Sequence, residues 1–282
     1  MSLGSHRLRP FTRALALLLL LAVGGSGAHA GAPESEAPAA GGLAPAAEPP
    51  LPPRTESDRL ADLRQSEREF LLGLAAQEHG DPASAEGPYR RAIELDPDFV
   101  EAHVNLARAW IALGRWEEAS RMLDRALVLR SDYPPAYSAR GLLALLRGEK
   151  TRARNELERT LLLDPDDVEA HVNLAALLLG QRALAPARIH LSRALELAPQ
   201  NVGAVLNRAL LEDLAGRPVE ATYYYDMYLD LAPWDDPDRR RVERRLEKLG
   251  AREAARVTSD PGVSHEGPTD LKKAEARTEG GV

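Results

Sequence analysis

Hydrophobic residues between positions 66 and 235 recur at helical spacing, in short stretches separated by Gly, Pro and Asp. Within each stretch the apolar residues stand three and four positions apart, which predicts an amphipathic helix rather than a strand. The order of large, small and polar positions returns every 34 residues, and each 34-residue window contains two apolar stripes. We therefore expect one helix pair per window, and stacking of the pairs covers the stripe that a single pair leaves exposed.

The 34-residue period is also visible in single residues. The octapeptide at 100–107 recurs unchanged at 168–175, which is 68 residues, or two periods, later. Alanines and prolines recur at the same period or its multiples: Ala85, Ala119, Ala153, Ala187 and Ala221, and Pro97, Pro165, Pro199 and Pro233. Self-similarity at this length is typical of an array of helix–turn–helix units.

On these residues the chain resembles the tetratricopeptide repeat family. Five windows match the family pattern without insertions: 66–99, 100–133, 134–167, 168–201 and 202–235. Position 8 of the family repeat, where the two helices touch, needs a small residue, and position 15 needs a turn glycine. The chain has Gly73, Ala107, Gly141, Ala175 and Ala209 at position 8, and Gly80, Gly114, Gly148 and Gly216 at position 15. The resemblance implies an all-α fold, a right-handed α-solenoid of five tandem repeats with a C-terminal capping helix.

Three local departures from the pattern stand out. Ser131 replaces the proline that ends a repeat, and we expect a looser junction there. Thr160 stands where alanine is expected, and Arg182 stands in place of a turn glycine.

The segments outside the repeats differ from them in composition. Residues 1–30 combine a basic start, an apolar core and a small-x-small motif, which indicates a secretory signal peptide cleaved after Ala30, with an uncleaved anchor as the alternative. Residues 31–55 are rich in Pro and Ala and predict a disordered linker, and residues 257–282 predict a disordered tail. The solenoid is expected at 56–256, with an extension of the first helix over 59–65 and a capping helix at 237–250.

Composition excludes several classes of function. The formal charge of −7 lacks the basic footprint of a nucleic-acid-binding protein, and the absence of Cys excludes disulfides, thiolate metal sites and a lipoprotein cysteine. The sequence has no phosphate-binding loop, nucleophile elbow or zinc-protease motif, so we expect neither an enzyme nor a cofactor. His103 and His171 are copies of one repeat position, and no metal site is expected there.

The resemblance implies that the first helix of each pair lines a concave groove for a peptide. Asn105, Asn173 and Asn207 share position 6, where they resemble a ladder that hydrogen-bonds a bound backbone, since an amide offers both donor and acceptor. The other candidate groove residues are Phe70, Val104, Arg108, Ile111, Leu142, Leu145, Val172, Leu179, Leu206 and Leu210. The alternative is that the apolar side chains pack between helices and that the asparagines bond internal backbone. Position 5 lacks the lysine of the family's carboxylate clamps, which disfavours a C-terminal carboxylate as ligand.

These features predict an exported scaffold, periplasmic or secreted, that binds an extended or apolar segment of a partner protein to assemble a cell-envelope complex. The alternative is a regulatory or scaffolding subunit of an envelope polysaccharide or peptidoglycan enzyme. Membrane contact is expected only through an uncleaved signal, or weakly through the basic cluster Arg239, Arg240, Arg241, Arg244 and Arg245, which Glu243 and Glu247 partly neutralise. In the tyrosine run, Tyr225 is expected in the core, with Tyr223 and Tyr224 exposed. The sequence does not predict an oligomeric state.

Overall fold

The structure is a computed structural model that describes the backbone of residues 55–259 and the side chains of residues 55–250. This part of the chain forms eleven helices and no strand. The predicted signal peptide lies outside the described residues, as do the linker up to residue 54 and the tail from residue 260. None of the described helices is both long and apolar enough to cross a membrane.

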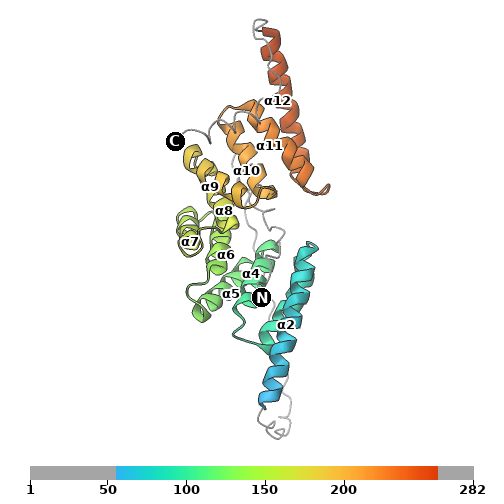
Figure 1. Ribbon diagram of the computed structural model, residues 1–282, viewed down its shortest axis with the longest axis vertical. Coiled ribbons are helices and arrows are strands. Elements are labelled where there is room, and N and C mark those ends of the chain that lie inside the picture. The colour runs from blue at the N-terminus through green and yellow to red at the C-terminus, as the bar shows by residue number, and fades with distance from the viewer. Residues whose placement is uncertain (1–54, 260–282) are drawn as a thin grey trace, which may run out of the picture.

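The helices form five consecutive pairs followed by one further helix. The pairs are α2 (Glu56–Glu78) and α3 (Pro82–Leu95), α4 (Val100–Ala112) and α5 (Trp116–Leu129), α6 (Pro134–Leu146) and α7 (Lys150–Leu163), α8 (Val168–Gly180) and α9 (Leu184–Leu197), and α10 (Val202–Leu214) and α11 (Pro218–Leu231). The last helix is α12 (Arg239–Ser259). The predicted all-α solenoid is confirmed, and Figure 1 shows the pairs following an arc from α2 to α12.

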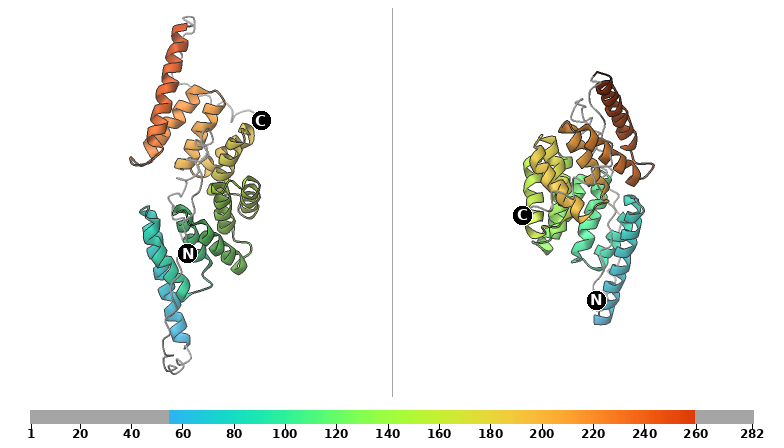
Figure 2. Two further views of the ribbon diagram at one scale, coloured as in Figure 1. Left: turned by 180° about the vertical axis from the view of Figure 1, so that it is seen from behind. Right: turned by 45° about the horizontal axis from the view of Figure 1, so that its top comes forward.

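Two rows of helices define the curvature. Within each pair the two helices contact each other, but the first helices also contact the first helices of neighbouring pairs, in the order α4, α6, α8, α10. The second helices have no comparable contact with one another, so the first helices are more crowded and form the inner side of the arc. The views in Figures 1 and 2 show the same arrangement, with α2 and α12 at the two ends. We call α4, α6, α8 and α10 the inner row.

The small residues at position 8 are explained by the large residue at position 24. A Cβ added to Gly73 would lie 2.5 Å from the ring of Tyr89, and one added to Gly141 would lie 2.7 Å from Leu157. The residues at positions 20 and 24 are buried throughout: Ala85, Ala119, Ala153, Ala187 and Ala221, and Tyr89, Leu123, Leu157, Leu191 and Tyr225. The repeat pattern therefore marks the interface inside each helix pair, where dense packing permits little change in volume.

The turn inside each pair has one residue with positive φ. Four of these residues are the expected glycines, and the fourth pair has Arg182 at φ 56°. A side chain in this region costs about 1–2 kcal/mol relative to the right-handed conformation. The turn is nevertheless kept, because the helices on both sides determine its path.

Position 4 connects consecutive repeats. The Nε2 atoms of His103 and His171 lie 2.9 Å from the carbonyl oxygens of Pro97 and Pro165, respectively. At the junction where Ser131 replaces proline, Tyr137 donates to the carbonyl of Ser131 at 2.8 Å. Helix α6 also starts 34 residues after α4 and 34 before α8, so the helix spacing is kept at this junction. Helices α5 and α6 nevertheless contact each other less extensively than the helices at the other junctions between repeats, so the junction is looser, as expected.

The two end helices are longer than the sequence predicts. Helix α2 begins at Glu56, where Thr55 and Asp58 form a reciprocal cap, rather than at residue 59. Helix α12 begins at Arg239 and continues to Ser259, beyond the predicted end at 250 and into the first residues of the predicted tail. Residues 251–256 contain alanine, arginine and glutamate, which are good helix formers, and the first proline after the start of α12 is Pro261.

Candidate functional site

The candidate groove residues all lie on the first helices of their pairs, but they differ in burial. Val104, Val172 and Leu179 have exposed fractions of at most 2%, and each belongs to a hydrophobic cluster between helices. Ile111, Leu142 and Leu206 are also buried, whereas Leu145 and Leu210 are partly exposed. The structure thus gives many of these side chains the packing role that the sequence left open as the alternative.

Phe70 belongs to the packing of the first repeat. Its ring centroid lies 5.7 Å from that of Tyr89 and 4.8 Å from that of Phe99, with tilted planes in both pairs. Aromatic pairs at these separations are favourable contacts beyond the area they bury. Phe70 therefore joins the two helices of its repeat to the start of the next one.

The three position-6 asparagines occupy different environments. Asn105 donates from Nδ2 to the carbonyl of Glu101 at 2.9 Å, which is a bond inside its own helix. Asn173 is 5% exposed and has no hydrogen bond to another described residue, and the buried Oδ1 of Asn207 also lacks a donor among the described residues. The ladder thus divides into one internally bonded asparagine and two, on the adjacent helices α8 and α10, with unused hydrogen-bonding capacity.

Arg108 is not a free groove cation. Its guanidinium lies 2.9 Å from Glu169, so the ion pair joins α4 to α8 and bypasses the intervening inner helix α6. Ser138 and Ala139 are the small, buried residues at positions 5 and 6 of α6, between the two helices. Burial lowers the pKa of Arg108, but the Glu169 carboxylate outweighs this and holds the pKa above its ordinary value. The pair fixes two repeats relative to each other across the concave side.

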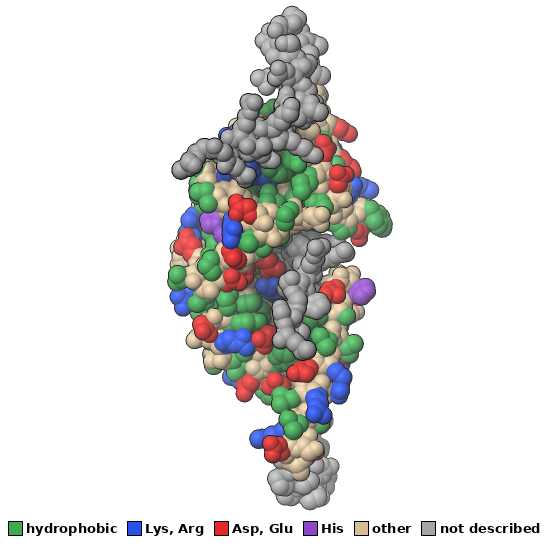
Figure 3. Space-filling model, viewed as in Figure 1, with side chains coloured by type: hydrophobic (Ala, Val, Ile, Leu, Met, Phe, Trp, Pro, Cys, Tyr) green, Lys and Arg blue, Asp and Glu red, His purple; other side chains and the backbone are tan. Residues whose placement is uncertain are grey.

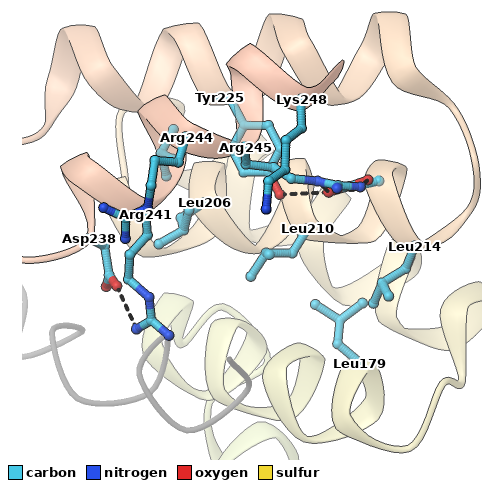
Figure 4. Close-up of a pocket in the computed structure, with 12 residues that line it drawn as sticks. Leu179, Leu206, Leu210, Leu214, Tyr225, Asp238, Arg241, Arg244, Arg245 and Lys248 are labelled. Carbon is cyan, nitrogen blue, oxygen red and sulfur yellow. Dashed lines mark hydrogen bonds and ion pairs between the residues drawn. The ribbon is translucent and has the colours of Figure 1, made fainter. Parts of the chain in front are cut away.

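An open cavity lies at the C-terminal end of the inner row (Figure 4). Three of the candidate groove residues, Leu179, Leu206 and Leu210, line it. The opposite wall is α12, from which arginine and lysine side chains reach toward the cavity. In this part of the predicted groove, apolar side chains line an open cavity.

Polar bonds hold α12 against the array. Arg245 is ion-paired with Asp213 of α10, and Tyr225 of α11 donates to the same carboxylate at 3.1 Å. Arg239 donates to the carbonyls of Leu229 and Ala232, which close the end of α11. Burial, and then the Asp213 charge, hold the pKa of Tyr225 above its ordinary value, so this hydroxyl stays a donor.

The basic cluster of α12 is therefore partnered differently from the prediction. Arg245 and Arg241 pair with Asp213 and Asp238, and the described ion pairs include neither Glu243 nor Glu247. Asp213 belongs to α10 and could not be found from spacing along α12, whereas Asp238 stands three residues before Arg241, directly ahead of the helix. On the face in Figure 3, acidic and basic side chains lie among hydrophobic ones rather than in one strongly basic area.

The remaining aromatic and histidine residues have structural surroundings. Tyr225 is buried, as predicted, and Tyr223 is 57% exposed. Tyr224 is only partly exposed: it meets Tyr223 edge-on at 5.1 Å, and Arg208 lies over its ring. The described residues contain no group of three or more His, Cys, Asp or Glu placed to hold a metal ion.

The sequence matches known family profiles, and the fold matches solved structures. A profile described as "Tetratricopeptide repeat" matches residues 76–146, and another with the same description matches residues 138–202. Among curated proteins, none matches the sequence.

Several solved structures share the fold. A thermophilic TPR protein of Thermus thermophilus aligns with a TM-score of 0.57 at 20% identity, covering 66% of this chain and 99% of its own. PilW, described as a widely conserved type IV pilus biogenesis factor, has a TM-score of 0.54 and 20% identity, with 73% and 98% covered. The pilF protein of Pseudomonas aeruginosa also has a TM-score of 0.54 and 20% identity, with 78% and 99% covered. At this identity the likeness shows a shared helical array.

Proposed function

Because this chain belongs to the tetratricopeptide repeat family, we propose that it is a non-catalytic scaffold that binds an extended segment of a partner protein along its inner row. The family fold is an interaction scaffold, and a curved array leaves its concave side available to a second chain. The proposal assigns no reaction and no cofactor to this protein. The bound segment is expected to be apolar, because Leu145 and Leu210 of the inner row are partly exposed and Leu210 lines an open cavity with other leucines.

The observation that carries the proposal is that neither Asn173 nor Asn207, on neighbouring inner helices, has a hydrogen bond to another described residue, and that the Oδ1 atom of Asn207 is buried. A buried polar group without a partner costs about 1–3 kcal/mol, and native proteins rarely leave one unpaired without a reason. A peptide backbone presents an N–H and a C=O in every residue, and these match the acceptor and donors of an amide side chain. A backbone along α8 and α10 would bond the amide of Asn173, and it would bond the buried Oδ1 of Asn207 once that side chain turns toward the groove.

We further propose that the protein acts outside the cytoplasm, in the assembly of a cell-envelope complex. The support for this part is the sequence of residues 1–30, with its basic start, apolar core and small-x-small motif. The solenoid would then meet partners in the periplasm or beyond the cell.

Photocrosslinking in living cells tests the binding face. A photoreactive amino acid replaces Leu142 on the inner helix α6, and a matched control replaces Leu162 on α7 of the same repeat. Leu162 is 71% exposed, so the control position is the more accessible of the two. We expect a defined crosslinked partner band from position 142, identified by mass spectrometry, and only background from position 162.

Equal crosslinking from both positions, or crosslinks from position 142 only to the chain itself, would contradict the proposal. A crosslinked partner that purified wild-type protein then binds directly would sharpen it. A Leu210→Glu change in the inner row, at a partly exposed position, should abolish that direct binding while the helical circular dichroism is retained.

A further inference from the structure

The cavity at the end of the inner row has an apolar wall. It measures about 420 Å³ and lies between α8, α10, α11 and α12 (Figure 4). Its apolar side chains are Leu179, Leu206, Leu210, Leu214 and Val242. Leu214 is 40% exposed, so part of this wall faces open space. Ligand sites in proteins commonly have volumes of about 300–1,000 Å³, so the cavity is large enough to take side chains from a bound chain.

The rim of the cavity is basic, and two of its four cations have no ion-pair partner among the described residues. Arg241, Arg244, Arg245 and Lys248 lie three, four and seven residues apart on one side of α12 and all line the cavity. Arg245 is neutralised by Asp213, and Arg241 by Asp238 at 3.4 Å. Arg244 and Lys248 are exposed, and neither has a carboxylate within 4.0 Å among the described residues. The rim therefore carries two uncompensated positive charges beside an apolar wall.

The cavity is continuous with the inner row. Leu179 belongs to α8, and Leu206 and Leu210 belong to α10, which are the helices that also carry Asn173 and Asn207. A peptide that follows this row toward the C-terminal end consequently reaches the cavity before it meets α12. A separate lipid or small-molecule site would not need this continuity.

Resting on the proposed function, we infer that the cavity holds an apolar side chain of the partner segment, and that Arg244 and Lys248 pair with carboxylates beside that side chain. The ligand is thus an acidic apolar peptide, with Asp or Glu next to a large aliphatic or aromatic residue. Burial of the apolar side chain supplies affinity, and the charges on the rim select the sequence around it. The selection resides in α12, outside the repeats themselves.

Fluorescence polarisation of the purified full chain with three labelled probe peptides tests this inference. The probes share a central Leu-Trp-Leu and differ only in their flanking residues, which are Glu, Gln or Lys. We expect affinity to fall from the Glu probe to the Gln probe to the Lys probe. In an Arg244→Gln/Lys248→Gln variant the Glu probe should lose about five-fold in affinity, while the Gln probe changes little.

A second double variant controls for overall charge. Arg240→Gln/Lys150→Gln also removes two exposed cations, but neither residue lines the cavity. It should leave the binding of the Glu probe within two-fold of wild type, and both double variants should keep the wild-type melting temperature. A Leu214→Trp variant narrows the cavity and should weaken the binding of the Glu and Gln probes alike.

Three results would overturn the inference: no binding of any probe, equal losses in the two double variants, or no preference for the Glu probe. A fourth result would show that the ligand is a lipid rather than a peptide. If the full chain floats with phosphatidylglycerol vesicles, and the Arg244→Gln/Lys248→Gln change abolishes flotation while the Glu probe does not bind, then the cavity is a lipid site. Crosslinking from position 142 is independent of these cations, so it can succeed where the peptide experiment fails, and the two proposals are judged separately.

Discussion

Repeats 2 and 4 begin with the same octapeptide, at 100–107 and 168–175, in two different surroundings. Some contacts are the same in both copies. His103 and His171 each bond the carbonyl of the proline six residues earlier, at 2.9 Å, and Ala107 and Ala175 are both fully buried. These contacts are made within a repeat or with the end of the preceding one, where the neighbouring sequence is also repeated.

The other contacts of the octapeptide differ. Nδ1 of His103 is buried without a partner among the described residues, while Nδ1 of His171 lies 3.0 Å from Nδ1 of His190. The two glutamates at the second position also diverge, since Glu101 pairs with Arg130 on the surface and Glu169 with the buried Arg108. The same octapeptide thus gives the same helix and the same contact with the preceding proline, and the surroundings of each copy decide what its other side chains do.

Substitutions at the two glutamates should give the largest difference in stability between the two repeats. Glu169→Gln leaves Arg108, whose side chain is 9% exposed, as a cation without its carboxylate, and should lower the free energy of unfolding by about 2 kcal/mol. Glu101→Gln removes a pair whose side chains are 44% and 35% exposed, and should lower it by about 0.5 kcal/mol or less. Urea unfolding followed by circular dichroism measures both. Equal losses would show that the connection between α4 and α8 contributes no more than a surface pair.

Substitutions at the turn residues should give the second-largest change in the free energy of unfolding. Arg182 has φ 56° where the equivalent Gly114 has φ 76°, so Arg182→Gly should relieve backbone strain and raise the free energy of unfolding by about 0.5–1 kcal/mol. Gly114→Arg should lower it by a similar amount, since a Cβ there meets nothing within 4 Å and only the backbone conformation is strained. Thermal unfolding of the two variants should therefore shift in opposite directions. A lower melting temperature for Arg182→Gly would mean that the arginine side chain stabilises the turn.

The histidine pair predicts a pH dependence that belongs to repeat 4. Burial, and then His171, lower the pKa of His190 below its ordinary value of 6.5; Arg154 acts in the same direction and Glu158 opposes it. As the pH falls below about 6.5, the unfolded chain binds a proton that folded His190 binds only at lower pH, so stability decreases with acidification.

Repeat 2 supplies the matched control for this effect. Its residue equivalent to His190 is Met122, so His190→Met makes the fourth repeat resemble the second. The variant should lose part of the fall in melting temperature between pH 7.5 and pH 5. If the melting temperature of the variant falls as much as that of the wild type between these pH values, the loss of stability arises from other groups.

The asparagines give the smallest change in stability and a larger one in binding. Asn105→Ala removes a bond to Glu101 but gains helix propensity, and Asn173→Ala loses no bond to a described residue, so both should alter the free energy of unfolding by only a few tenths of a kcal/mol. Crosslinking from position 142 to the partner should weaken in Asn173→Ala and persist in Asn105→Ala. Equal crosslinking in the two variants would remove Asn173 from the binding face.

The sequence predicted the features that recur in every repeat, but it did not predict the contacts that differ between repeats. The 34-residue pattern predicted the helix pairs, the close approach of the two helices at Gly73 and the turn at Arg182, because each depends on residues a short distance apart in the chain. It could not identify the partner of Arg108, which is 61 residues away. Such a contact depends on the curvature of the stack and on the small side chains of the helix between.

The candidate site was predicted in position but not in detail. All its residues lie on the first helices, yet side chains such as Val104 are buried between helices. Position 4 as a junction contact was missed, although His103, Tyr137 and His171 share the signal of a donor six residues after position 32 of the preceding repeat. The cavity under α12 was missed because its wall is made by a helix outside the period.

The ion pair between Arg108 and Glu169 also affects how the array loses its structure. Arrays of this kind behave approximately as a line of units that interact only with the next unit, so that a stretch in the middle can open by itself. A bond that reaches over one unit removes that freedom, because the third repeat cannot open without the second and fourth separating. The middle three repeats should therefore exchange their amide hydrogens as one cooperative block, while fraying is confined to α2 and α12.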